Sequence, residues 1–358
     1  LVPCYEEDAD GNRKRIVELD RVEEKIGHHG SVTASLNFER APAHLIGTRG
    51  DGFKLMLMLM NNARVGVGFE CIGVCEASHR LAREYAAERK SMGKTIDRHE
   101  IIADYLDEMR TDIQGLRALA MHGAYHEEMA QKLKIKLQHF PPTDELESKK
   151  LIREQKRHAS KARRVTPLLK YTGAEKAVEM ARRCLQIHGG NGYTTEYGAE
   201  RLVRDALVMP IYEGTSQIQS LMAMKDALGA VMKNPQGFLK RQAQARWRAV
   251  SAPDPLERRV ARIQALSAAA QNALMTRTAT DKFRSVQHLP IAEWPKAFTK
   301  NWDPKRDFAF AMLHAERLCQ LLSDEAVSEL LLEQAKQHED RRELLERYLE
   351  RAEPRCRY

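Results

Sequence analysis

The stretch Ile211-Tyr-Glu-Gly-Thr-Ser-Gln-Ile-Gln219 places a single carboxylate, Glu213, between an aromatic residue and a glycine, followed by hydroxyl and amide side chains. A carboxylate that takes a proton from carbon needs an apolar wall to raise its basicity, and a small neighbour lets a substrate carbonyl approach the backbone. Tyr212 and Gly214 supply these two features, so the stretch predicts a catalytic loop. The structural alternative is a carboxylate that is stabilised by the dipole of the helix after it.

The composition indicates a folded protein with no membrane span. The chain has 358 residues, 43% of them hydrophobic, which is enough for two or three packed units. Its longest apolar run, residues 53–60, is far shorter than the 18 or so residues that a membrane helix needs. The six cysteines are scattered without a C-x-x-C pair, which favours a reducing compartment, cytoplasmic or matrix-like. The N-terminus lacks an initiating Met and resembles the middle of a strand, so we interpret the sequence as a fragment.

The net charge of +8 is unevenly distributed. Residues 149–164 carry eight cations and one anion. Such a segment could bind nucleic acid, a membrane or a phosphorylated coenzyme. The alternative is an ordinary solvated helix face, since exposed helices are charged by default.

Periodicity divides the chain into three parts. Residues 1–51 alternate and turn as β-strands do. From Gly52 onward apolar residues recur at helical spacing, with Val65 and Phe69 on one face. The expected helices run from Gly52 to the Gly93-Lys94 pair, over residues 99–132 and 161–187, and onward from Gly214. We expect domains at residues 1–51 (the end of a β domain), 52–233 (a helical bundle) and 234–358 (an additional helical domain).

Together with the Glu213 loop, several other segments resemble the acyl-CoA dehydrogenase family, flavoenzymes that desaturate the α,β bond of acyl-CoA thioesters. In chain order they are Glu23–Gly30, Phe38–Pro42, the helix from Asn61, Arg89–Ile96, Gln186–Tyr193 and Arg204–Ala206. Each segment alone is a weak match. Their occurrence in the family's order makes the resemblance specific.

The resemblance implies a mainly α fold, with the remnant of a β-barrel-like middle domain, a four-helix bundle that binds FAD and substrate, and an extra C-terminal helical region. It implies that Glu213 is the general base that removes the α proton of the thioester, while FAD accepts a hydride from the β carbon. In some relatives the base lies on the first long helix instead. That position is Ala63 here, which favours Glu213.

The resemblance also assigns the remaining site residues. The substrate-binding residues are Asn61, Arg64, Tyr212 and Gly214. The cofactor-binding residues are Arg89, Ser91, His99, Gln186, Gly189, Gly190, Thr215 and Gln217. Arg89 and the Gly189-Gly190 pair are expected to reach the flavin of a neighbouring subunit, although an arginine at a helix end and a Gly-Gly helix stop are the structural alternatives. Met92 and Glu100 depart from the phenylalanine and glutamine common in the family, and a carboxylate near a phosphate would repel it.

The expected partners are an acyl-CoA substrate, an electron-transfer flavoprotein as electron acceptor and a second copy of the chain, as a homodimer or homotetramer. We expect no metal site, because the exposed turn at His28-His29 lacks a third ligand at metal spacing. One alternative is an acyl-CoA oxidase, which passes electrons to oxygen. Another is a DNA-associated flavoprotein of the same fold that binds through residues 149–164 and 240–262. A third is a scaffold that has lost activity.

Overall fold

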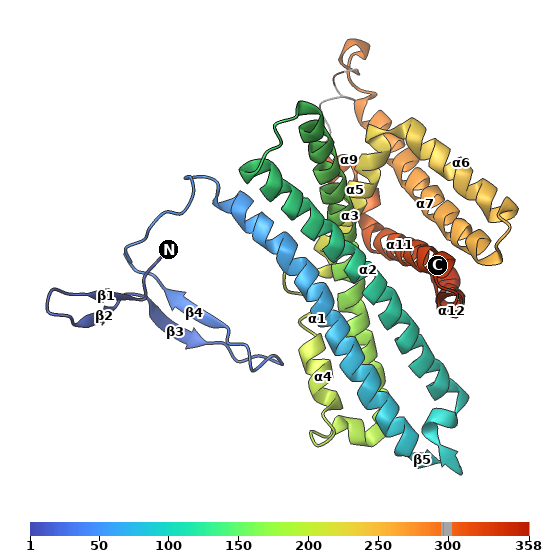
Figure 1. The fold of residues 1–358 in the computed structure, drawn as a ribbon, viewed down its shortest axis with the longest axis horizontal. Helices are drawn as coiled ribbons and strands as arrows, with labels where there is room; N and C mark the ends of the chain where they lie inside the picture. Colours follow the sequence, from blue (N-terminus) through green and yellow to red (C-terminus); the bar gives the residue numbers. More distant parts are fainter. Residues whose placement is uncertain (295, 297–302, 358) are drawn as a thin grey trace.

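The computed structural model describes residues 1–294, 296 and 303–357, and helices dominate it (Figure 1). The α-helices are α1 (Gly52–Glu88), α2 (Glu100–His139), α3 (Glu145–His188), α4 (Ala199–Ala206), α5 (Ser216–Lys233), α6 (Pro235–Ser251), α7 (Pro255–Val286), α9 (Pro304–Asp307), α10 (Ala309–Leu313), α11 (Ala315–Gln337) and α12 (Arg341–Arg355). The strands are β1 (Tyr5–Glu7), β2 (Arg13–Arg15), β3 (Glu18–Val22), β4 (Ala34–Asn37), β5 (Lys90–Ser91) and β6 (Lys94–Thr95). The predicted mainly α fold is confirmed. Within the described residues, no helix is long and apolar enough to cross a membrane.

The strands before α1 form two antiparallel hairpins, β1-β2 and β3-β4, which lie beside the helical bundle (Figure 1). Their side chains are largely exposed, as expected for ribbons with no second layer. The turn between β3 and β4 contacts the bundle, because the backbone N–H of His28 donates to Asp205 Oδ1 at 2.7 Å. Gly27 permits this approach, since a Cβ there would lie 2.6 Å from the carbonyl oxygen of Arg204. The His28-His29 turn, which the sequence predicts to be exposed, therefore partly packs against the helical bundle.

Three helix boundaries differ from the sequence prediction. Helix α2 ends at His139, one to two turns beyond the expected end at residue 132. Helix α1 ends at Glu88 rather than at the Gly93-Lys94 pair, because Met92 and Gly93 both take positive φ, 49° and 83°, and form the tight turn between β5 and β6. Helix α3 begins at Glu145 rather than near Lys161. Asp144 caps it by accepting hydrogen bonds from the N–H groups of residues 146 and 147. The basic segment 149–164 is the largely exposed first half of this helix, so its apolar periodicity is weak.

A close crossing of α1 and α3 organises the bundle. A Cβ at Gly68 would lie 2.6 Å from the side chain of Leu169, and one at Gly173 would lie 3.2 Å from Cys71 Cβ. The buried face of α1 therefore runs through Gly68 and Cys71. Phe69, which was predicted to share the buried face, is 40% exposed. Val65, predicted on the same face as Phe69, is buried, so apolar periodicity identifies part of this face. It misses the glycine positions because glycine carries no side chain to mark them.

The C-terminal helices share the core of the bundle. One apolar cluster joins Ile113 of α2 and Leu169 of α3 to Ile263 of α7, Leu331 of α11 and Leu349 of α12. Helix α6 begins just after the expected boundary at residues 233/234, but the buried core is continuous across it.

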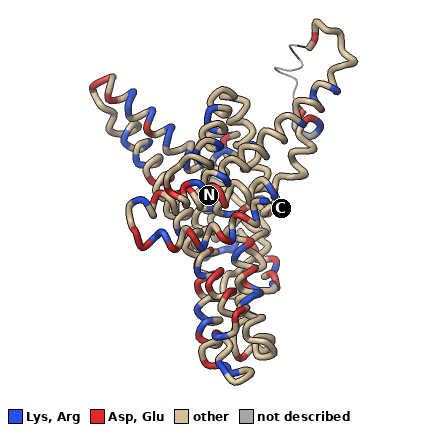
Figure 2. The backbone as a smooth tube through the Cα atoms, turned by 90° about the vertical axis from the view of Figure 1, so that its right-hand side faces the viewer, with Lys and Arg blue, Asp and Glu red and all other residues tan. Residues whose placement is uncertain are grey.

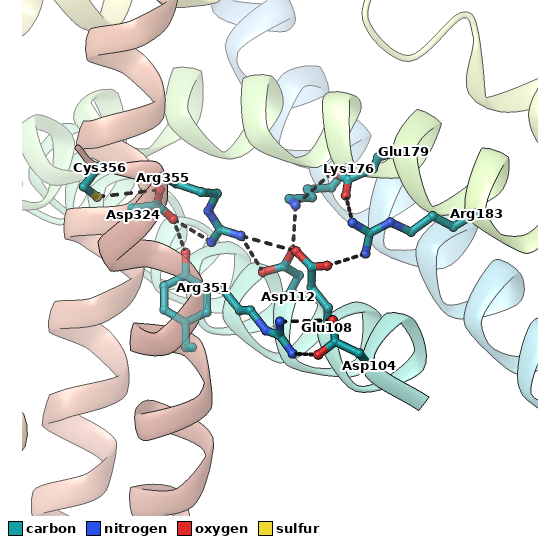
Figure 3. Close-up of polar contacts among 11 residues, drawn as sticks. Asp104, Glu108, Asp112, Lys176, Glu179, Arg183, Asp324, Arg351, Arg355 and Cys356 are labelled. Atoms are coloured by element: carbon teal, nitrogen blue, oxygen red, sulfur yellow. Dashed lines mark hydrogen bonds and ion pairs between the residues drawn. The ribbon is translucent and has the colours of Figure 1, made fainter. Parts of the chain in front are cut away.

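An ion network also ties α12 to the bundle (Figure 3). Arg355 donates to Asp324 at 2.9 Å and lies 3.6 Å from Asp112, which in turn pairs with Lys176 at 2.7 Å. The side chain of Asp112 is only 4% exposed. Burial alone would raise the pKa of Asp112, but Lys176 and Arg355 hold it below its ordinary value. The negative charges of Asp112 and Asp324 are therefore balanced in part by Arg355.

Replacement of Arg355 by methionine should lower the free energy of unfolding by about 3–5 kcal/mol, because it leaves buried carboxylates without their cation. Urea unfolding followed by circular dichroism measures the loss. Arg347→Met is the matched control, since Arg347 lies on the same helix but its pair with Asp107 is largely solvated. That change should cost less than about 1 kcal/mol. Equal losses in the two variants would contradict a special role for Arg355.

A second buried ion pair joins α7 to α9. Lys282 Nζ donates to Asp307 Oδ2 at 2.8 Å, and both side chains are 1% exposed. Burial raises the pKa of Asp307, but hydrogen bonds from Arg306 and Lys282 outweigh it and lower the pKa to about 2. Its ordinary value is 3.8.

This depressed pKa predicts an acid-sensitive contribution to stability. The contribution of Asp307 should be fully present above about pH 5 and disappear as the pH falls from about 4 to about 2, where the folded state also takes up the proton. The difference in unfolding free energy between the wild type and Asp307→Asn should follow that course. The exposed Asp340→Asn serves as control and should show no such dependence. A difference that stays constant down to pH 2 would contradict the assignment.

Candidate active site

Glu213 lies in the turn of residues 207–215, between α4 and α5, in a strained conformation. Its φ is 53°, in the left-handed region that residues with a Cβ rarely adopt, and Gly214 follows with φ 93°. Its Oε2 atom is buried and accepts no hydrogen bond within the described residues. Both features cost stability, and they are typical of sites where function requires them.

Two buried side chains hold the backbone of this turn. Arg64 Nε donates to the carbonyl oxygen of Glu213 at 2.9 Å. Gln219 Nε2 donates to the same oxygen at 3.3 Å and to that of Gly214 at 3.2 Å. Burial lowers the pKa of Arg64, while the charge of Glu213 opposes that shift. These donors fix the main chain and leave the Oε2 atom of Glu213 unbonded.

Gly214 has no room for a side chain. A Cβ at this position would lie 2.7 Å from Gln219 Nε2 and 3.4 Å from Arg64 Nη2. The positive φ therefore favours glycine here, and a Cβ would also have to displace the end of the Gln219 side chain.

Tyr212 is partly buried against the core, and its hydroxyl donates to the carboxylate of Glu70. Burial, and then the hydrogen bond to Glu70, raise the pKa of the Tyr212 hydroxyl. The sequence motifs do not indicate Glu70, nor do they indicate Lys170, whose ammonium lies 5.9 Å from the centroid of the Tyr212 ring. No local motif marks either residue, because both lie on long helices remote from the loop in sequence.

Two cofactor-binding residues, Thr215 and Gln217, are expected just after Glu213. Thr215 lies at the end of the Glu213 turn. It is the N-cap of α5, and its hydroxyl accepts a hydrogen bond from the N–H of Ile218 at 3.3 Å. Gln217 instead donates to Glu316 of α11 at 2.8 Å. The side chain of Asn61, the other expected substrate contact on α1, lies outside the described residues.

The other expected cofactor residues gather at the far end of the bundle, where α1 and α3 end. Ser91 accepts a hydrogen bond at its carbonyl oxygen from His99 Nε2 at 3.1 Å. Gly189, with φ 60°, and Gly190 follow α3 with exposed backbone and open space where a side chain would be. The remaining members, Arg89 and Gln186, are exposed. At 1.5 Å per residue, about 37 Å of helix separates Arg64 from Arg89, so the expected residues form two groups in one chain.

A model of the acyl-CoA dehydrogenase C-terminal domain matches residues 50–138 and 149–228, the segment that contains both groups. The chain belongs to the acyl-CoA dehydrogenase family. Acryloyl-CoA reductase (NADH) of Anaerotignum propionicum is 34% identical over 213 residues, which cover 59% of this chain and 47% of that protein. An acyl-CoA dehydrogenase of Bacillus subtilis is 32% identical over 214 residues, covering 59% of this chain and 49% of that protein. The chain thus spans about half the length of these two curated relatives.

The likeness in fold extends beyond the segment that the family model matches. The acyl-CoA dehydrogenase of Bacillus anthracis, solved in complex with FAD, superposes with a TM-score of 0.70 and 18% identity. The match covers 98% of this chain and 59% of that one, so it includes the C-terminal helices. An acyl-CoA dehydrogenase fold with an added helical region is the architecture that the sequence predicted.

Replacement of Gly214 by alanine should lower the free energy of unfolding by about 1–3 kcal/mol, because it combines a strained φ with a steric conflict. Urea unfolding measures the change. Gly66→Ala on α1 is the matched control: a Cβ there meets nothing within 4 Å, and the exchange should stabilise the helix by about 0.5–1 kcal/mol. Opposite signs in the two variants are the expected result, and a neutral Gly214→Ala would contradict the geometry.

Proposed function

We propose that this protein is an FAD-dependent acyl-CoA dehydrogenase in which Glu213 is the general base. The observation that carries the proposal is the Glu213 turn itself. The Glu213 carboxylate has a buried oxygen without a hydrogen-bond partner among the described residues, on a strained backbone whose carbonyl oxygen accepts from buried Arg64 and Gln219. Relatives named acyl-CoA dehydrogenase, including one from Bacillus subtilis, support the substrate class.

The chemistry proposed for this chain is proton removal and orientation of the thioester. The Glu213 carboxylate takes the α proton, and the electron pair of that C–H bond forms the new double bond. The backbone N–H of Glu213 donates to the thioester oxygen, which becomes negative as the proton leaves. FAD, when bound, accepts the hydride that leaves the β carbon. Asn61, Arg64, Tyr212 and Gly214 form the substrate side of the site.

The residues proposed for FAD fit a dinucleotide. The Gly189-Gly190 backbone is exposed and has open space where side chains would lie, so a ligand can approach it closely, and Arg89 is exposed at the same end of the bundle. Ser91, His99 and Gln186 belong to this group. Thr215 and Gln217 lie with Glu213, and Gln217 must exchange its bond to Glu316 to contact the cofactor.

The separation of the two groups supports a homo-oligomer. A flavin beside Glu213 cannot reach Arg89 of the same chain along about 37 Å of helix. A second copy must therefore bring its own Arg89 and Gly189-Gly190 end to that flavin, which makes a homodimer the smallest active unit and leaves a homotetramer compatible with it. The proposal includes an electron-transfer flavoprotein as acceptor, a reducing compartment and the division into residues 1–51, 52–233 and 234–358.

The DNA-associated alternative finds little support in the charge distribution. Lys and Arg are interspersed with Asp and Glu along the helices (Figure 2). In the basic segment, Lys149 pairs with Glu145 at 2.6 Å, and Arg163 forms two hydrogen bonds of 2.8 Å with Asp226. These pairs favour a solvated helix face for residues 149–164.

The test is anaerobic bleaching of the flavin absorbance in the FAD-loaded protein by a panel of saturated acyl-CoAs. Bleaching should depend on acyl chain length, and Glu213→Gln should slow it by about 10²–10⁴-fold, because amide nitrogen and oxygen cannot take the α proton. Glu196→Gln, an exposed glutamate outside the turn, is the matched control and should bleach at the wild-type rate.

Readmission of oxygen after bleaching separates the dehydrogenase from the oxidase. Slow recovery of absorbance in oxygen, with fast recovery on adding an electron-transfer flavoprotein, is expected for the dehydrogenase, and fast recovery in oxygen alone would identify an oxidase. FAD-loaded protein that no thioester bleaches would overturn the proposed function.

A further inference from the structure

Lys170 of α3 is a buried cation for which the site described above gives no role. Its side chain is fully buried, with a relative exposure of 0%. Its Nζ donates to the carbonyl oxygen of Met209 at 2.6 Å, and it forms no ion pair with a carboxylate within the described residues. Removing an ammonium from water without a counter-ion is costly, so the position requires an explanation.

The groups around Lys170 belong to the Glu213 turn and to the α1–α3 crossing. The charged groups that act on Lys170 are Glu175, Arg64 and Glu213. Burial lowers the pKa of Lys170, whereas Glu175 and Glu213 work against that shift. Glu175 already accepts a hydrogen bond from Ser216 at 2.6 Å, at the start of α5.

The bond to Met209 fixes the first half of the turn. Met209 is fully buried, and its N–H donates to the carbonyl oxygen of Ala206 at 3.0 Å. The N–H of Tyr212 donates to Val208 at 3.1 Å. A shift of the Met209 carbonyl would therefore move the residues that lead into Glu213.

We propose that Lys170 is a positioning residue for Glu213, acting with Arg64 as a clamp of two buried cations on the turn. Lys170 reaches from α3 to the Met209 carbonyl, and Arg64 reaches from α1 to the Glu213 carbonyl. The clamp holds the carboxylate in its strained conformation, and the positive field of both groups favours negative charge at the site. The proposal rests on the proposed function, since positioning matters through the base that is positioned.

The test compares Lys170→Met with Lys282→Met in the FAD-loaded protein. Both lysines are fully buried, but Lys282 lies on α7 and is paired with Asp307. Lys170→Met should slow flavin reduction by a saturating acyl-CoA roughly 10- to 100-fold, as a small misplacement of the base does, with KM changed less than about threefold. Lys282→Met should destabilise the fold and leave the reduction rate of the folded protein unchanged.

A second readout does not depend on the reaction. Amide hydrogen exchange in residues 207–214 should be faster in Lys170→Met than in the wild type and unchanged in Lys282→Met. If Lys170→Met fails to fold, Lys170→Gln replaces it with the same expected directions, because the glutamine side chain carries no charge and is one bond too short to keep the 2.6 Å contact with the Met209 carbonyl.

The outcomes are distinguishable. Slower reduction with faster exchange in the turn supports the proposal. Wild-type rates and wild-type exchange in the Lys170 variant would overturn it. If no acyl-CoA reduces the wild-type flavin, the proposed function fails, and unchanged exchange in the turn would then refute the clamp as well, while faster exchange would show that Lys170 fixes the turn.

Discussion

The close crossing of α1 and α3 is the constraint on which the candidate site depends. Leu169 lies where any side chain at position 68 would be, so the two helices approach at the distance that glycine allows. One turn of α1 before Gly68 lies Arg64, and next to Leu169 lies Lys170. Because the helices cross closely, these two cations arrive at the same turn from different helices. If the two helices lay farther apart, at least one of these cations would no longer reach the Glu213 turn.

The hydrogen bonds to this turn offset the energetic cost of its strained conformation. Glu213 in the left-handed region and an unpaired carboxylate oxygen are each unfavourable alone. Hydrogen bonds from Arg64, Gln219 and Lys170 to backbone carbonyls offset this cost without occupying the side chain of Glu213. In the proposed reaction, this arrangement orients the base before substrate binds, since the polar groups around it are already in place.

The C-terminal helices share one apolar cluster with the bundle. Leu331 and Leu349 pack with residues of α2 and α3, and Arg355 compensates Asp112 and Asp324. The continuous core explains how a region outside the family-model match can stabilise the bundle that carries the site. About 37 Å of helix separates Arg64 from Arg89, at the two ends of that bundle, and this separation links the proposed activity to the proposed homo-oligomer.

The sequence by itself determined the family, the mainly α fold and the identity of the candidate base, because these are carried by short local motifs such as residues 211–219. It also indicated Arg64, through its place in a motif. Only the tertiary structure decided that α3 begins at Glu145, that Gln217 donates to Glu316 of α11, and that Lys170 donates to the Met209 carbonyl. The physical reason is that these contacts join residues far apart in the chain. Their partners are selected by how helices pack, and neither apolar periodicity nor a local motif records that choice.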